Sequence, residues 1–133
     1  MIGLDTNVVI RYLAQDEPRQ AAAATRVFER TLSPENPGVL TQVTLCEVAW
    51  VLAECYGADR DRIRSVIEGL LATRQILVQD ADIVWKALRA WTSSTADFSD
   101  ALIGESLRAQ GCSKVVTFDK AAARLPGWEL LPP

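Results

Sequence analysis

Short apolar runs alternate along this chain with longer segments whose apolar residues recur at the spacing of a helix. The short runs are predicted to be strands, over about residues 1–4, 39–41, 76–78, 115–118 and 128–131. The longer segments are predicted to be helices, over about residues 8–13, 18–32, 45–55, 63–71, 83–91, 98–110 and 120–125. Strands separated by helices pair in parallel, because each parallel connection needs a crossover. The sequence therefore predicts an α/β fold with a mostly parallel sheet between helical layers.

The residue types present in the chain limit the reactions that it can catalyse. A chain of 133 residues fits one domain, which we expect to span residues 1–133. It contains no histidine, which excludes histidine-based nucleases, Ser-His-Asp hydrolases and thiol proteases. The net charge of -3 lacks the basic excess that is usual in nucleic-acid-binding proteins, which counts against such a function. A cluster of four carboxylates awaiting a cation would contribute up to about four of the negative charges, which weakens this objection without removing it. Only acidic side chains remain to carry catalysis.

The three cysteines show no pattern of a disulfide framework or a zinc site. Cys46, Cys55 and Cys112 are odd in number and lack C-x-x-C spacing, so we predict small buried apolar side chains in a reduced chain. No secretory signal and no apolar run of membrane-spanning length is evident. We expect a soluble, cytoplasmic protein without a membrane partner.

Four acidic residues stand at predicted strand or helix ends: Asp5, Glu47, Asp100 and Asp119. Each has a structural alternative as a helix cap. Asp5 and Asp119 follow strands and precede helices, the position of an N-cap. Glu47 fits the S/T-x-x-E capping box that begins at Thr44 and would then lie in the first turn of its helix.

Asp97 and Asp100 are three residues apart and share one face of the helix that begins there. Asp97 is the better candidate for the N-cap, whereas Asp100 precedes the apolar run Ala101, Leu102, Ile103 and so has a partly buried face. A carboxylate in that position favours a cation nearby. Open α/β sheets bind ligands at the carboxyl ends of their strands, so we expect the four acids, with Thr6, Asn7 and Thr117, to converge at one sheet edge. Carboxylates there would suit Mg²⁺ or Mn²⁺.

Four segments, in order, resemble those of the PIN-domain ribonucleases, and most closely the VapC-type toxins of toxin–antitoxin pairs. They are 4–8 (LDTNV), 44–47 (TLCE), 97–103 (DFSDALI) and 116–119 (VTFD). The resemblance implies a three-layer α/β/α sandwich and a Mg²⁺- or Mn²⁺-dependent endoribonuclease, the toxin of a type II pair, which cleaves RNA with a metal-activated water.

The resemblance also assigns residues and partners. Asp5, Glu47, Asp100 and Asp119 would be the catalytic metal ligands. Thr6, Asn7 and Thr117 would give hydrogen-bonding support, and Asp97 would be an auxiliary acid. The implied partners are the RNA substrate, a cognate antitoxin that inserts a basic side chain among the acids, and a second copy of the chain in a homodimer.

Other functions remain open at this point. A non-toxin nuclease of the same family and a catalytically silent RNA- or protein-binding scaffold share these features. A phosphohydrolase with the pattern D-x-D-x-T would need an acid at position 7, where the chain has Asn7. Seven arginines are candidates for phosphate contacts, although solvated helix faces explain most such charges. They are Arg11, Arg19, Arg26, Arg30, Arg60, Arg62 and Arg64.

Overall fold

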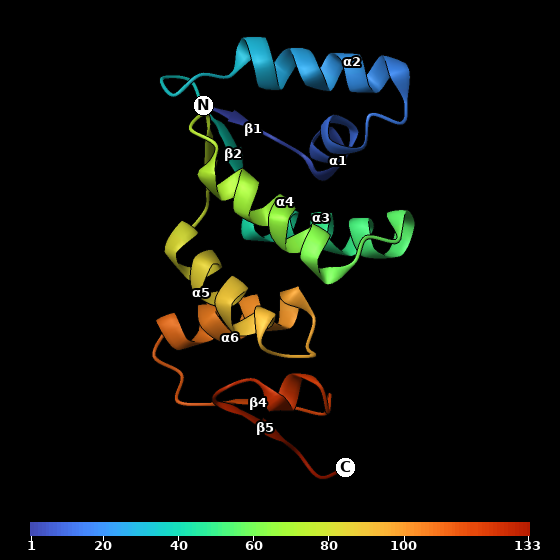
Figure 1. The fold of residues 1–133 in the computed structure, drawn as a ribbon. Helices are drawn as coiled ribbons and strands as arrows, with labels where there is room; N and C mark the ends of the chain where they lie inside the picture. The colour runs from blue at the N-terminus through green and yellow to red at the C-terminus, as the bar shows by residue number, and fades with distance from the viewer. The chain divides into compact units, whose positions relative to one another are not determined.

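The computed structural model describes residues 1–133 as six α-helices, five short strands and two shorter helical turns (Figure 1). The chain divides into two compact units, Met1–Gln79 and Asp80–Pro133. Each unit contains its own parallel strands and its own helices. The expectation of a single domain stays a prediction.

The N-terminal unit is built around three parallel strands. Its elements are β1 (Ile2–Gly3), α1 (Thr6–Ala14), α2 (Pro18–Arg26), the π-helical turn η1 (Val27–Thr31), β2 (Gly38–Leu40), α3 (Gln42–Tyr56), α4 (Arg60–Ala72) and β3 (Ile76–Val78). Strand β2 lies between β1 and β3, with Val39 opposite Gly3 on one side and Leu77 on the other. Because all three strands run the same way, β1 and β2 end at one edge. Helices α1 and α3 begin there.

Side chains at the helix starts decide where the helices of this unit begin. Asp5 is the N-cap of α1, and Thr41 is the N-cap of α3. Asp59 caps α4 by accepting a hydrogen bond from Arg62 N at 2.8 Å. Pro18 occupies the first turn of α2, where its missing N–H leaves no helical hydrogen bond unmade.

Apolar residues from these helices fill the space against the strands. Val9 of α1, Leu40 of β2, Leu45 and Val48 of α3, and Ile67 of α4 are fully buried. Helix α1 packs against both α2 and α3, and α4 packs against α3 and β3. This packing holds the start of α1, with Asp5, beside α3, which carries Glu47.

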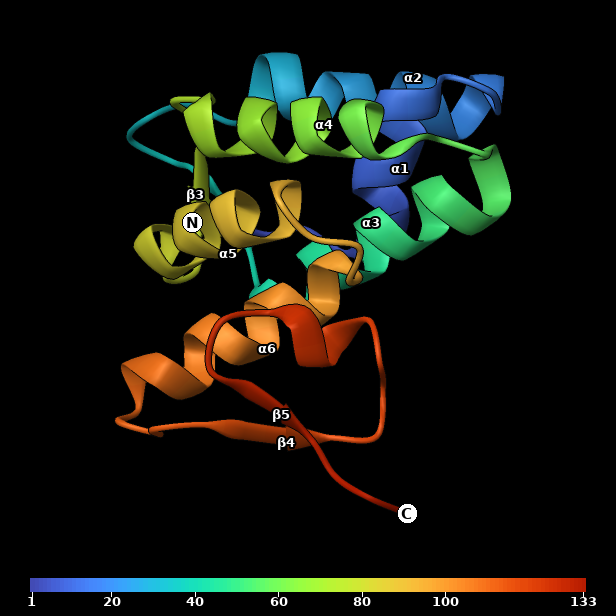
Figure 2. The ribbon, with the colours of Figure 1, turned by 60° about the horizontal axis from the view of Figure 1, so that its bottom comes forward.

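The C-terminal unit contains two packed helices and a parallel strand pair (Figure 2). Its elements are α5 (Ala81–Thr92), α6 (Phe98–Ala109), β4 (Val115–Thr117), the 3₁₀ turn η2 (Ala122–Arg124) and β5 (Trp128–Leu130). Helix α5 lies along α6, where the rings of Trp91 and Phe98 meet edge to face at 5.7 Å. Strand β5 pairs in parallel with β4, and Trp128 lies opposite Val115.

The predicted α/β class with parallel strands is confirmed. The helix expected over 18–32 changes from α to π geometry after Arg26, and the helix expected over 120–125 is a single 3₁₀ turn. The prediction of buried cysteines was wrong for two of the three: Cys55 and Cys112 are exposed, because they lie at the end of α3 and just after α6, and Cys46 is half-buried. No helix is long and apolar enough to cross a bilayer.

Candidate functional site

Two predicted acids lie together at the start of α1 and along α3. Asp5 Oδ1 accepts a hydrogen bond from Thr6 N at 2.8 Å, and Thr6 Oγ1 donates to Glu47 Oε1 at 3.1 Å. Thr6 therefore links Asp5 to Glu47, which lies 41 positions after Thr6 in the sequence. Both carboxylates are exposed. We call Asp5 and Glu47 the N-terminal acidic pair.

The predicted capping box at Glu47 was wrong. The hydroxyl of Thr41 accepts from Thr44 N at 3.1 Å, so the helix begins three residues earlier than the box requires. Glu47 then lies beyond the first turn of α3, too far along to reach back to an unpaired N–H at the helix start. Its hydrogen bond from Thr6 is made outside the helix, which removes the structural alternative for this acid.

The C-terminal unit holds a second set, Asp97, Asp100 and Asp119, which we call the C-terminal acidic group. Asp97 is the N-cap of α6 as predicted, and Asp100 lies in the first turn. Burial raises the pKa of Asp100, and the negative charges of Asp97 and Asp119 raise that pKa further, against a smaller opposing hydrogen bond from the Asp97 backbone. Like charges are thus close enough to disfavour ionisation, an arrangement that a cation would relieve.

Asp119 caps the turn that follows β4. Its Oδ1 accepts hydrogen bonds from Ala121 N at 2.8 Å and Ala122 N at 3.1 Å. Its own N–H donates to Thr117 Oγ1 at 3.0 Å, so Thr117 holds the backbone of Asp119. Asp5 and Asp119 each use only Oδ1 for these bonds, and Oδ2 of each makes no hydrogen bond within the chain.

A hollow of about 400 Å³ adjoins the N-terminal acidic pair between α1 and α3. Asp5, Thr6, Asn7 and Glu47 line one part of it. Asn7 is exposed there, beside the acids as predicted. Five further lining residues were not predicted as site residues: Ile10, Arg11, Val51, Cys55 and Tyr56. Arg11 appeared in the sequence only as one of many arginines, and no pattern marked Tyr56.

The donor set of both groups fits a hard divalent cation. Carboxylate and hydroxyl oxygens are the ligands that Mg²⁺ and Mn²⁺ prefer, and neither histidine nor a cysteine pair competes for the site. No three acidic side chains are arranged closely enough to hold a metal ion together. The acids therefore form a pair in one unit and a group in the other. The expected convergence of all four stays a prediction.

One family model matches nearly the whole chain. No curated protein gives a significant match to the sequence. The model of the PIN domain family matches residues 2–127, which cover most of both compact units and all the acids named above. The parallel strands and six α-helices are consistent with the three-layer α/β/α fold of that family. On this match, the chain belongs to the PIN domain family.

Proposed function

We propose that this protein is a Mg²⁺- or Mn²⁺-dependent endoribonuclease and the toxin of a type II toxin–antitoxin pair. PIN domains are in general metal-dependent nucleases. The observation that carries the proposal is that Asp5 and Asp119 cap their helical turns with one oxygen and keep Oδ2 unbonded within the chain. Their capping roles therefore do not compete with binding a cation.

In this proposal Asp5, Glu47, Asp100 and Asp119 serve one reaction as metal ligands. These residues would hold Mg²⁺ or Mn²⁺, which would activate a water and neutralise charge on the scissile phosphate. Thr6 holds the carboxylate of Glu47 through its hydroxyl, and Thr117 holds the backbone of Asp119. Asp97 contributes negative charge beside Asp100, and Asn7 supplies an amide next to the N-terminal acidic pair.

The proposed partners follow from the same charges. Uncompensated carboxylates attract an arginine, whose planar fork of N–H donors matches a carboxylate. A cognate antitoxin that inserts such a side chain would displace the cation and block RNA. We also propose a homodimer, as the family resemblance implies, and a cytoplasmic location.

The nuclease is tested with mixed single-stranded RNAs in Mg²⁺ or Mn²⁺, with and without EDTA. We expect cleavage that EDTA abolishes. Asp5→Asn and Asp100→Asn should each remove it, and the double variant should lose no more than either single one, because residues that act as a unit are not additive. Asp82→Asn is the matched control, since Asp82 is an exposed first-turn acid of α5.

Two outcomes would reject parts of the proposal. Cleavage that survives chelation or either substitution contradicts the metal mechanism. Losses that multiply in the double variant would show that the two acids contribute independently and do not act as one unit. The toxin role is tested by expressing the chain with and without the neighbouring small reading frame. Normal growth in both cases would point to a non-toxin nuclease instead.

A further inference from the structure

The hollow beside the N-terminal acidic pair has two chemically different ends. At one end lie Asp5 and Glu47, and at the other lie Arg11 and Tyr56. Arg11 is six residues further along α1 than Asp5, which corresponds to roughly 9 Å along the helix axis. An anionic chain that reached the acids with one phosphate would therefore meet a guanidinium and an aromatic ring with its next segment.

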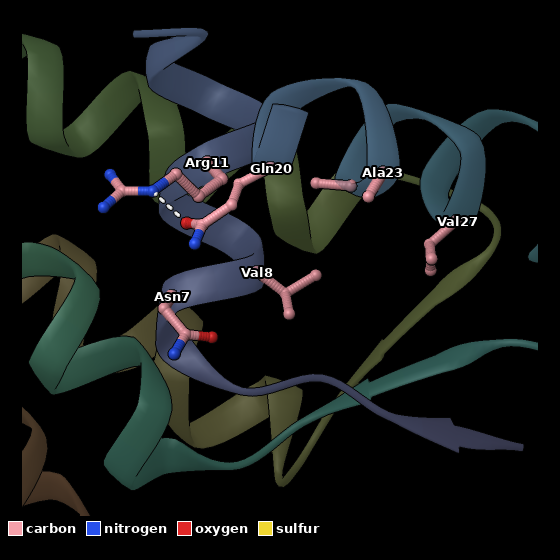
Figure 3. A pocket seen from close by; sticks show the side chains of 7 residues that line it. Asn7, Val8, Arg11, Gln20, Ala23 and Val27 are labelled. Carbon is pink, nitrogen blue, oxygen red and sulfur yellow. Dashed lines mark hydrogen bonds between the residues drawn. The ribbon is translucent and has the colours of Figure 1, made fainter. Parts of the chain in front are cut away.

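Arg11 is held in place from three sides. Its Nε donates to Gln20 Oε1 at 2.7 Å, as Figure 3 shows, and its Nη1 donates to Tyr56 OH at 3.2 Å. Nη1 also lies 3.5 Å from Asp16 Oδ1. These contacts use Nε and Nη1, while Nη2 makes no hydrogen bond within the chain. The side chain is 31 % exposed and lines the hollow, so its guanidinium is held in place at the edge of this space.

Tyr56 is fixed through its hydroxyl and open at its ring. The OH donates to Asp16 Oδ2 at 2.8 Å, which ties the end of α3 to the segment between α1 and α2. The residue keeps 39 % of its surface exposed and lines the hollow. An aromatic ring with few remaining degrees of freedom is a good platform for a nucleobase, because little entropy is lost when the base stacks.

We infer that this end of the hollow is a subsite for single-stranded RNA, in which Arg11 binds a backbone phosphate and Tyr56 stacks on the adjoining base. The inference rests on the proposed ribonuclease function for the identity of its ligand. The guanidinium of Arg11 belongs to α1 and the ring of Tyr56 belongs to α3, and both line the hollow. Their placement therefore supports the subsite whether or not the acids bind a metal ion. Arg11 and Tyr56 are thus positioning residues that hold the strand beside the acids.

The test separates the ring of Tyr56 from its hydroxyl. RNA affinity is measured by fluorescence anisotropy with a labelled single-stranded oligonucleotide, in an Asp100→Asn background that does not cleave. Tyr56→Leu removes the stacking face and should weaken binding about 5- to 150-fold, the range of one base–aromatic stack. Tyr56→Phe keeps the ring and should retain most of the affinity. Trp50→Ala is the matched control, since Trp50 is an exposed aromatic of α3 outside the hollow.

The phosphate contact is tested through salt dependence. Arg11→Gln should reduce the slope of log affinity against log salt by about 0.7, the value for one phosphate contact on a single strand. Arg74→Gln, which removes an exposed arginine just after α4 that lines no part of the hollow, should leave the slope unchanged. In the cleaving protein, Arg11→Gln and Tyr56→Leu should raise KM with little change in kcat, because they act on binding of the strand.

Each result decides a different question. Equal losses for Tyr56→Phe and Tyr56→Leu would show that only the hydroxyl network matters and would overturn the stacking role. Wild-type affinity in Tyr56→Leu and an unchanged salt slope in Arg11→Gln would overturn the subsite while leaving RNA cleavage intact. A chain that binds RNA through these residues yet never cleaves it would support the subsite and reject the nuclease. Thermal unfolding of every variant confirms that it is folded.

Discussion

Gly104→Ala is a sharp test of how α6 holds the C-terminal strand pair. Gly104 is buried in α6, and a Cβ built on it would lie 2.5 Å from Trp128 Nε1 and 3.2 Å from Trp128 Cε2. Trp128 opens β5, and β5 pairs with the strand that leads to Asp119. The rigid indole must therefore shift as a whole, and overpacking of this kind costs about 1–3 kcal/mol.

The helix propensity of alanine works in the opposite direction and has to be separated from the clash. Gly69→Ala supplies that correction, because Gly69 lies in α4 and a Cβ there meets no atom within 4 Å. Both variants gain about 1 kcal/mol from propensity, so their difference isolates the overpacking of Trp128. An unfolding entropy of about 2.1 cal/mol/K per residue gives about 0.28 kcal/mol/K for this chain, so the two Tm values should differ by about 4–11 °C.

The assay is thermal unfolding of both variants beside the wild type, in EDTA, followed by circular dichroism. Gly69→Ala should melt above the wild type and Gly104→Ala well below Gly69→Ala. Because β5 supports the strand before Asp119, Gly104→Ala should also lose RNA cleavage at a temperature where it remains folded. Equal Tm values for the two variants would refute the close approach of Trp128 to α6.

Three further results are expected. The pKa of Asp100 is raised in the folded chain by burial and by its acidic neighbours, so the metal-free protein loses stability as pH rises from the unfolded value of about 3.9 through the raised folded value. Asp100→Asn should therefore raise the Tm in EDTA at pH 7 and lose this advantage below about pH 4, and a pH-independent effect would contradict this. Thr41→Ala should lower the free energy of unfolding, measured in urea, by about 0.5–2 kcal/mol, because Thr41 caps α3. Glu47→Gln should leave that free energy almost unchanged. The reverse order would show that Glu47 belongs to a capping box. Thr6→Val should weaken Mg²⁺ binding in calorimetry with at most about 1 kcal/mol of lost stability, since its bond to Glu47 is exposed; unchanged Mg²⁺ affinity would remove Thr6 from the site.

The fold class could be predicted because apolar periodicity reports directly on which faces are buried. Leu45, Val48 and Leu52 recur at helical spacing, and all three are buried in α3. The exact helix start could not be predicted in the same way. Thr41 and Thr44 are both good caps locally, and the choice between them depends on where β2 ends, at Leu40, which is set by pairing with strands elsewhere in the chain.

The positions of Asp5 and Asp119 at the starts of helical turns could be predicted, whereas their role as metal ligands stays a prediction. A strand end that leads into a helix favours an acid as a cap, and it also lies at the edge where α/β proteins bind ligands. Arg11 and Tyr56 had no comparable signal. Their contact joins positions 45 apart on two helices, and neither helix start, turn nor motif marks it. Only the packing of α1 against α3 brings them together.

Capping and metal binding are separable at Asp5, and the separation can be measured. Asn is as good an N-cap as Asp, so Asp5→Asn should keep the bond to Thr6 N and leave the free energy of unfolding nearly unchanged. Asp5→Ala should lose the cap as well, at a cost of about 0.5–2 kcal/mol. If the carboxylate serves only the fold, RNA cleavage will follow stability and Asp5→Asn will stay active. If Oδ2 serves a cation, both variants will be inactive although only one is destabilised. The cap then acts as the support that holds the ligand, because the bond that fixes Oδ1 also fixes Oδ2.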